Sequence, residues 1–117
     1  MTTLSTPTAE AIITRQLVFR SHKDTFISDL EDPSSSQFKH RVGLLLNNLV
    51  PLFRQAFVSF LRIRIISFRN GSIINTLELD FASHAPTNTA IEEVLFNAAS
   101  SIADFSIETS SIVVSDP

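Results

Sequence analysis

A candidate self-cleavage site lies near the middle of the chain, where Asn70-Gly71-Ser72 separates two apolar stretches. Asn-Gly between such stretches is a strong signal for a tight β-hairpin, and we expect Asn70 and Gly71 at the centre of its turn. Ser72 then places a hydroxyl nucleophile directly beside the Gly71 carbonyl. Attack on that carbonyl carbon would move the acyl group from nitrogen to oxygen and leave an ester for water to hydrolyse.

The residue types at this site suit such a reaction. Gly71 has no Cβ, so it leaves the carbonyl open to approach and permits unusual backbone angles. A nucleophile tethered one bond away gains from proximity, which can be worth an effective molarity of about 10⁵–10⁸ M when the groups are well oriented. An Asn-Gly turn is relaxed, however, so any strain on the bond must come from the strand register. An ordinary hairpin in which Ser72 is only a turn residue is the alternative.

Other chemistry is less well supported by the sequence. Asn70-Gly71-Ser72 is also an N-glycosylation sequon, which makes Asn70 a candidate glycan site in a secreted protein. A triad of Ser72, His84 and Asp80 can be written, but we expect Asp80 to face solvent and His84 to lie in a loop. The three histidines show no metal-ligand spacing, and two glycines cannot form a phosphate-binding loop. We therefore expect no metal and no cofactor.

The composition is that of one globular domain. The chain has 117 residues, of which 44% are hydrophobic and 18% charged, enough for a core without disulfides. Ten phenylalanines and no tryptophan or tyrosine indicate aromatic residues used for the core. Because cysteine is absent, disulfides, thiol catalysis and thiolate metal sites are excluded.

Charge is distributed unevenly along the chain. Every basic residue lies at or before Arg69, whereas residues 72–117 contain acidic residues and no basic ones. The basic excess of the first part is spread over separate elements and matches no nucleic-acid motif, so we expect no nucleic-acid partner. The apolar runs are too short to span a bilayer, so membrane attachment would need segments absent from this chain.

The hydrophobic pattern predicts two helices and four strands. A first strand runs from Gln16 toward Phe26, and a helix follows the start signal Asp32-Pro33, with Pro51 expected to end or kink it. Thr89 and Glu92 match a capping box for a second helix, and a last strand contains Ile112-Val113-Val114. Residues 1–10 are rich in serine and threonine and are expected to be a linker or the end of a glycosylated stalk.

The central hairpin requires an irregularity. Alternating residues along 61–65 place Ile63 and Ile65 inward, but the phase then shifts so that Phe68 becomes the inward residue. An extra residue near Ile65-Ile66, a β-bulge, would reconcile the two phases and place Arg62 opposite Glu78. The order β-α-β-β-α-β then predicts an α+β, ferredoxin-like fold, with an antiparallel sheet and both helices on one face.

Three stretches resemble the SEA domain, an extracellular module of membrane mucins, some proteoglycans and related membrane-anchored proteins. They are Leu30–Ser36, Phe68–Ile74 and the closing Ile112–Pro117. Gly71-Ser72 followed by two β-branched residues is similar to the family's cleavage motif, although Asn75 stands where an aliphatic residue is usual. The resemblance covers residues 11–117, nearly the whole chain.

The resemblance implies a function. A SEA-like domain here would be extracellular, part of a membrane-bound mucin-like or secreted glycoprotein with carbohydrate-rich neighbours. It would cleave itself once at Gly71-Ser72, and its fragments 1–71 and 72–117 would remain paired as a heterodimer. Such a single turnover would not make it an enzyme. An uncleaved SEA-like spacer or adhesion module, and an intracellular ferredoxin-like binding domain, are the alternatives.

Overall fold

The computed structural model describes residues 11–117, and its α+β, ferredoxin-like order confirms the predicted fold. The expected linker at residues 1–10 lies outside the described residues. The first strand begins earlier than predicted and ends at the polar interruption. The elements are β1 (Ile12–Ser21), the 3-10 turn η1 (Ser28–Glu31), α1 (Ser36–Ala56), β2 (Phe60–Asn70), β3 (Ile73–Ala82), α2 (Asn88–Ala98), η2 (Ala99–Ser101) and β4 (Glu108–Ser115).

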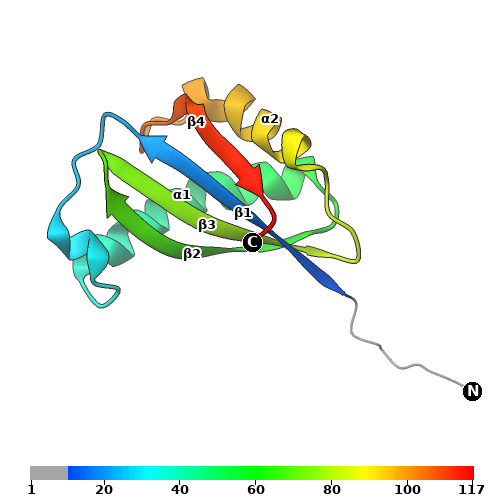
Figure 1. The fold of residues 1–117 in the computed structure, drawn as a ribbon, viewed down its shortest axis with the longest axis horizontal. Coiled ribbons are helices and arrows are strands. Elements are labelled where there is room, and N and C mark those ends of the chain that lie inside the picture. Colours follow the sequence, from blue (N-terminus) through cyan, green and yellow to red (C-terminus); the bar gives the residue numbers. More distant parts are fainter. Residues whose placement is uncertain (1–10) are drawn as a thin grey trace, which may run out of the picture.

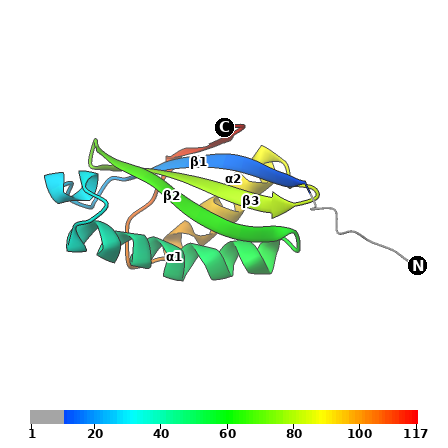
Figure 2. The same cartoon turned by 90° about the horizontal axis from the view of Figure 1, so that it is seen from below.

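The four strands form one antiparallel sheet in the order β2-β3-β1-β4 (Figure 1). The first helix connects β1 to β2 across β3, and the second connects β3 to β4 across β1. Both helices cover the same face of the sheet, as the side view shows (Figure 2). Strands that are consecutive in the chain are therefore adjacent in the sheet only within the β2–β3 hairpin.

The core lies between the helices and this face of the sheet. The α1 stripe contributes Leu45, Leu49 and Phe53, all of which are fully buried. From the sheet, Leu17 and Leu77 are fully buried opposite each other on β1 and β3. Most phenylalanines belong to this core, as the composition predicted. Burial of apolar area stabilises the fold by about 25 cal/mol per Å².

The first helix differs from its prediction at both ends. Its N-cap is Ser35, whose hydroxyl accepts the Phe38 N–H at 3.0 Å, and Asp32 instead accepts the backbone and hydroxyl of Ser34. Pro51 lies inside the helix, which continues to Ala56. The helix survives the lost N–H because its last turns bury Phe53 against the sheet.

The second helix also begins before its predicted cap. Thr87 is the N-cap and accepts the Ala90 N–H at 3.1 Å, so the Thr89–Glu92 capping box is wrong. Glu92 instead accepts the Val114 N–H at 2.8 Å and thereby joins α2 to β4. The Glu92 carboxylate therefore bonds a residue distant in sequence and does not cap its own helix.

The β2–β3 hairpin contains the predicted bulge. Ile65 pairs with Leu77 and Ser67 with Thr76, so Ile66 is the extra residue. The structure has a second register shift between Phe60 and Arg62 that the sequence pattern did not indicate.

The predicted register of this hairpin is wrong by two residues. Arg62 lies opposite Asp80, and Arg64 lies opposite Glu78. The turn accounts for the difference, because its central residues are Gly71 and Ser72, between the paired Asn70 and Ile73.

Truncation of Leu49 should test the core. We expect Leu49→Ala to lower the free energy of unfolding by about 2–5 kcal/mol. Leu49 is 0% exposed, so its truncation leaves a cavity under the sheet. Urea denaturation of chains kept in one piece by Ser72→Ala measures the change. A loss below about 0.5 kcal/mol, the usual size of a surface effect, would contradict this packing.

Candidate functional site

Gly71 and Ser72 form the tip of the hairpin in an unusual backbone conformation. Gly71 has φ 138° and Ser72 has φ 60°. The left-handed region is readily accessible to glycine but costs other L-residues on the order of 1–2 kcal/mol. The two residues that flank the candidate scissile bond therefore both have positive φ, which is costly for Ser72 and readily adopted by Gly71.

The Ile74 side chain also crowds the space beside Gly71. A Cβ at this position would lie 2.8 Å from Ile74 Cδ1 and 3.2 Å from Ile74 Cγ1. The pairing of Phe68 with Asn75 and of Asn70 with Ile73 determines which residues fall in the turn. As a result the relaxed Asn70-Gly71 turn is displaced by one residue, and Ser72 takes a central position.

The Ser72 hydroxyl lies beside a cation. Arg20 Nη2, on β1, donates to Ser72 Oγ at 3.4 Å, and Arg20 Nη1 lies 3.6 Å from Glu108 Oε1. The guanidinium is half-exposed and can only donate hydrogen bonds, so it orients the hydroxyl oxygen without removing its proton. Asn70, the sequon asparagine, is exposed at the end of β2.

An ion-pair cluster joins β2 to β3 on the face of the sheet opposite the helices. Asp80 is only 1% exposed, because Arg62 (2.9 Å) and Arg64 (2.9 Å) cover it, and Thr14 donates to it at 2.7 Å. The expectation that Asp80 points into solvent is therefore wrong. Hydrogen bonding from Arg64, aided by Thr14 and by both positive charges, holds the pKa of Asp80 below its ordinary value against the effect of burial.

The structure does not bring the candidate triad together. Ser72 precedes β3 and His84 follows it, so a ten-residue strand, about 33 Å long, separates them. Asp80 is occupied by its arginine partners. Among residues 11–117, no group of three or more His, Cys, Asp or Glu side chains is placed to hold a metal ion.

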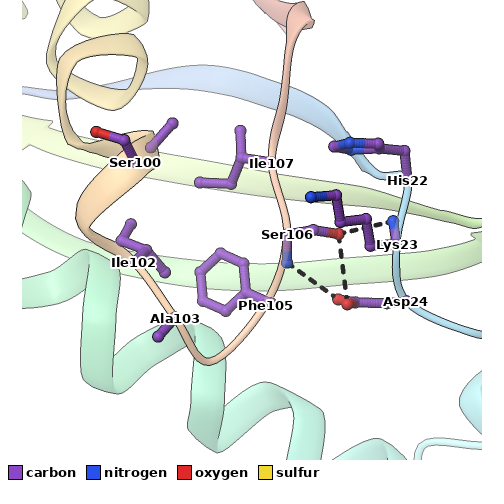
Figure 3. Close-up of a pocket in the computed structure, with 10 residues that line it drawn as sticks. His22, Lys23, Asp24, Ser100, Ile102, Ala103, Phe105, Ser106 and Ile107 are labelled. Carbon is purple, nitrogen blue, oxygen red and sulfur yellow. Dashed lines mark hydrogen bonds between the residues drawn. The ribbon is translucent and has the colours of Figure 1, made fainter.

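A cavity of about 390 Å³ opens between the loop after β1 and the segment before β4 (Figure 3). Phe105 and Ile102 form its apolar wall, and His22 lies at its edge. Asp24 accepts the backbone N–H and the hydroxyl of Ser106 at 3.4 and 3.3 Å, which ties the two segments together. No sequence pattern indicates this cavity, because its walls are distant along the chain.

Arg41 and Asn75 form a buried contact near the hairpin that the sequence pattern did not predict. Arg41 is only 7% exposed and contacts Asn75, which is fully buried three residues after Ser72. A signal for Arg41 existed: it lies three residues after Phe38 and four before Leu45, on the apolar stripe of α1. The sequence signal for Asn75 is its place in the resembled cleavage motif, where an aliphatic residue is usual.

The chain is similar in sequence to a matrix proteoglycan. It is 36% identical over 86 residues to interphotoreceptor matrix proteoglycan 2 of Mus musculus, across 71% of this chain. The chain spans only 7% of the length of that proteoglycan. No protein-family model matches the sequence. In the part of the chain that the structure describes, no helix is long and apolar enough to cross a membrane.

Neutralising Asp80 should destabilise the fold in a pH-dependent way. We expect Asp80→Asn to cost about 1–3 kcal/mol at pH 7, because two arginines lose the negative charge and one acceptor oxygen of their buried partner. Since the folded-state pKa of Asp80 is lowered, its stabilisation is complete above its unfolded-state pKa near 3.9 and is lost as pH falls through the folded-state value. Denaturation of both chains between pH 7 and pH 2 measures this convergence.

Glu78→Gln is the matched control for that series. Glu78 lies two residues away on the same strand and contacts Arg64 alone, at 2.9 Å, so its effect should be smaller. A stability gap between wild type and Asp80→Asn that stays constant down to pH 2 would contradict the ion-pair account.

Proposed function

We propose that this chain is an extracellular SEA-like module that cleaves itself once between Gly71 and Ser72 and persists as a non-covalent pair of fragments. The observation that carries the proposal is the backbone of the turn, where Ser72 is held at φ 60° beside Gly71 at φ 138°. Strained conformations of this kind cost on the order of 1–3 kcal/mol each, and breaking the bond between these residues releases that cost.

The similarity to a matrix proteoglycan supports the extracellular part of the proposal. Proteoglycans are among the protein classes in which the resembled module occurs, and the Gly-Ser pair lies in the expected hairpin. As part of a longer glycoprotein, the domain would have carbohydrate-rich neighbours. It would reach a membrane only through segments absent from this chain.

The proposed cleavage consumes one water molecule. Ser72 Oγ attacks the Gly71 carbonyl carbon, the carbon–nitrogen bond breaks, and the hydroxyl proton passes through solvent to the leaving nitrogen. The product is an ester between Gly71 and Ser72 Oγ, with a free amine on Ser72. Water then hydrolyses this ester to a Gly71 carboxylate and restores the Ser72 hydroxyl. The guanidinium of Arg20, 3.4 Å from Oγ, orients the nucleophile.

The sheet order supports the persistence of the pair. In β2-β3-β1-β4, strands of fragment 1–71 alternate with strands of fragment 72–117, so each ladder in the sheet joins the two fragments. Among residues 11–117, every ion pair except Arg41–Asp24 also joins one fragment to the other. Separation of the fragments therefore requires the sheet to come apart.

Removal of the Ser72 hydroxyl tests the cleavage. We expect the wild-type chain to yield fragments 1–71 and 72–117 on a denaturing gel and by intact mass, and Ser72→Ala to yield one intact chain, because only the hydroxyl can attack. Ser67→Ala, which removes a hydroxyl from the same hairpin away from the bond, is the control and should cleave normally. An intact wild-type chain would refute cleavage and favour the uncleaved spacer.

Salt tests the contribution of charge to the pair. We expect the cleaved protein to elute as one species on size exclusion, and 1 M NaCl to lower its urea dissociation midpoint modestly, because the exposed ion pairs between fragments are screened. The intact Ser72→Ala chain in the same salt is the reference. A cleaved protein that separates in buffer without denaturant would contradict the proposed pairing.

A further inference from the structure

A buried polar cluster lies on the inner face of the sheet, two residue pairs from the hairpin tip. It consists of Arg41 from α1, Ser21 at the end of β1, and Asn75 of β3. Ser21 and Asn75 are fully buried, and Arg41 is 7% exposed. Burying polar groups lowers the stability of a fold unless each group has a hydrogen-bond partner. The partners of these three residues therefore indicate what the cluster does.

Arg41 holds both members of one cross-strand pair. Its guanidinium carbon lies 5.4 Å from the centre of the Phe68 ring. Its Nε and Nη2 donate to Asn75 Oδ1 at 3.2 and 2.9 Å, in a forked contact. Phe68 and Asn75 lie directly opposite each other on β2 and β3. One side chain from α1 therefore fixes which residue of β3 lies opposite Phe68.

Asn75 is in turn anchored to β1. Its Nδ2 donates to Phe19 O at 3.1 Å and to Ser21 Oγ at 3.0 Å. Ser21 Oγ also accepts Arg41 Nη2 at 2.9 Å. The amide has no freedom to move along the strand without breaking these bonds, so β3 is fixed against β1 and α1 together.

The local sequence favours a different register. A two-residue turn with Asn70 and Gly71 at its centre would be relaxed, because asparagine and glycine both tolerate positive φ. That turn would place Phe68 opposite Ile73 instead of Asn75. Arg41 then has no single position from which to contact both Phe68 and Asn75, and the two-residue slip also separates Asp80 from its arginines.

We propose that Arg41 and Asn75 are positioning residues for the cleavage: they hold the hairpin out of the register that its Asn-Gly sequence prefers, and thereby force the strained conformation onto Ser72. This inference rests on the proposed function for its effect on cleavage. Its effect on the register is independent of whether the bond breaks. Neither residue contacts the reacting atoms in this account.

The register is measured in chains that cannot cleave. In the Ser72→Ala background, NMR cross-strand contacts should place Phe68 opposite Asn75. Arg41→Met with Asn75→Val replaces the cluster by apolar side chains of similar size, a change that buried polar networks often tolerate. In that double variant, cross-strand contacts between Phe68 and Ile73 should appear, although the Asp80 cluster still favours the original register. An unchanged register in the double variant would overturn the proposal.

Cleavage is measured in the same variants with Ser72 present. We expect the double variant to cleave at least about tenfold more slowly than wild type, because the strain on Ser72 is relieved. Leu49→Ala is the matched control: Leu49 lies on α1 away from the hairpin tip, so its loss destabilises both registers equally and should leave the rate near that of wild type. Equal slowing by Leu49→Ala would assign the effect to stability alone and overturn the proposal.

A rescue variant separates positioning from packing. Asn70→Thr disfavours the competing turn, because a β-branched residue resists positive φ, yet it suits the strand position that Asn70 occupies here. Added to the double variant, Asn70→Thr should restore the register and most of the cleavage rate, using protein made without glycans. Failure to restore either would count against the proposal, since only competition between registers predicts rescue.

Two further results, a double variant that does not fold and a wild-type chain that does not cleave, also test the proposal. If the double variant does not fold, Ser21→Ala removes one shared acceptor and should still slow cleavage more than Leu49→Ala does; a wild-type rate would overturn the proposal. If the wild-type chain never cleaves, the proposed function fails, while the register contacts in the Ser72→Ala chains still support or overturn the positioning role.

Discussion

The register between β2 and β3 is the constraint on which the rest of this domain depends. Burial of Phe68 on the helix side requires one extra residue in β2, and Ile66 supplies it as a bulge. The pairing beyond the bulge then leaves Gly71 and Ser72 at the centre of the turn. Strain at the tip is thus a consequence of the strand pairing further down the hairpin. The local preference of the tip residues does not set it.

Two groups of side chains hold this register from opposite faces of the sheet. On the open face, Asp80 lies beneath Arg62 and Arg64 and reaches Thr14 on β1. On the helix face, Arg41 spans Phe68 and Asn75. Burial lowers the pKa of Arg41, and its contact with Asp24 opposes that shift. A slip of two residues would break both groups at once, which makes the strained turn the less costly choice.

The same topology explains how a broken chain could remain one domain. Because the crossovers interleave the strands, each fragment supplies alternate strands of the sheet, and each supplies one helix over the shared core. The structure explains the uneven distribution of charge along the sequence. Basic residues before the turn meet acidic residues after it across the strand pairs. The candidate scissile bond lies at the boundary between these two sets.

The sequence by itself determined the order of the elements, the ferredoxin-like plan and the bulge at Ile66. The spacing of apolar residues along each segment shows which side chains must face the core, and this spacing can be read locally. It predicted that Gly71 and Ser72 belong to a hairpin tip. Only the tertiary structure decided which two residues occupy the centre of that turn. Local propensity favours Asn-Gly, but contacts from α1 and β1, far away in the chain, set the register. For the same reason Glu92 bonds β4 instead of capping its own helix.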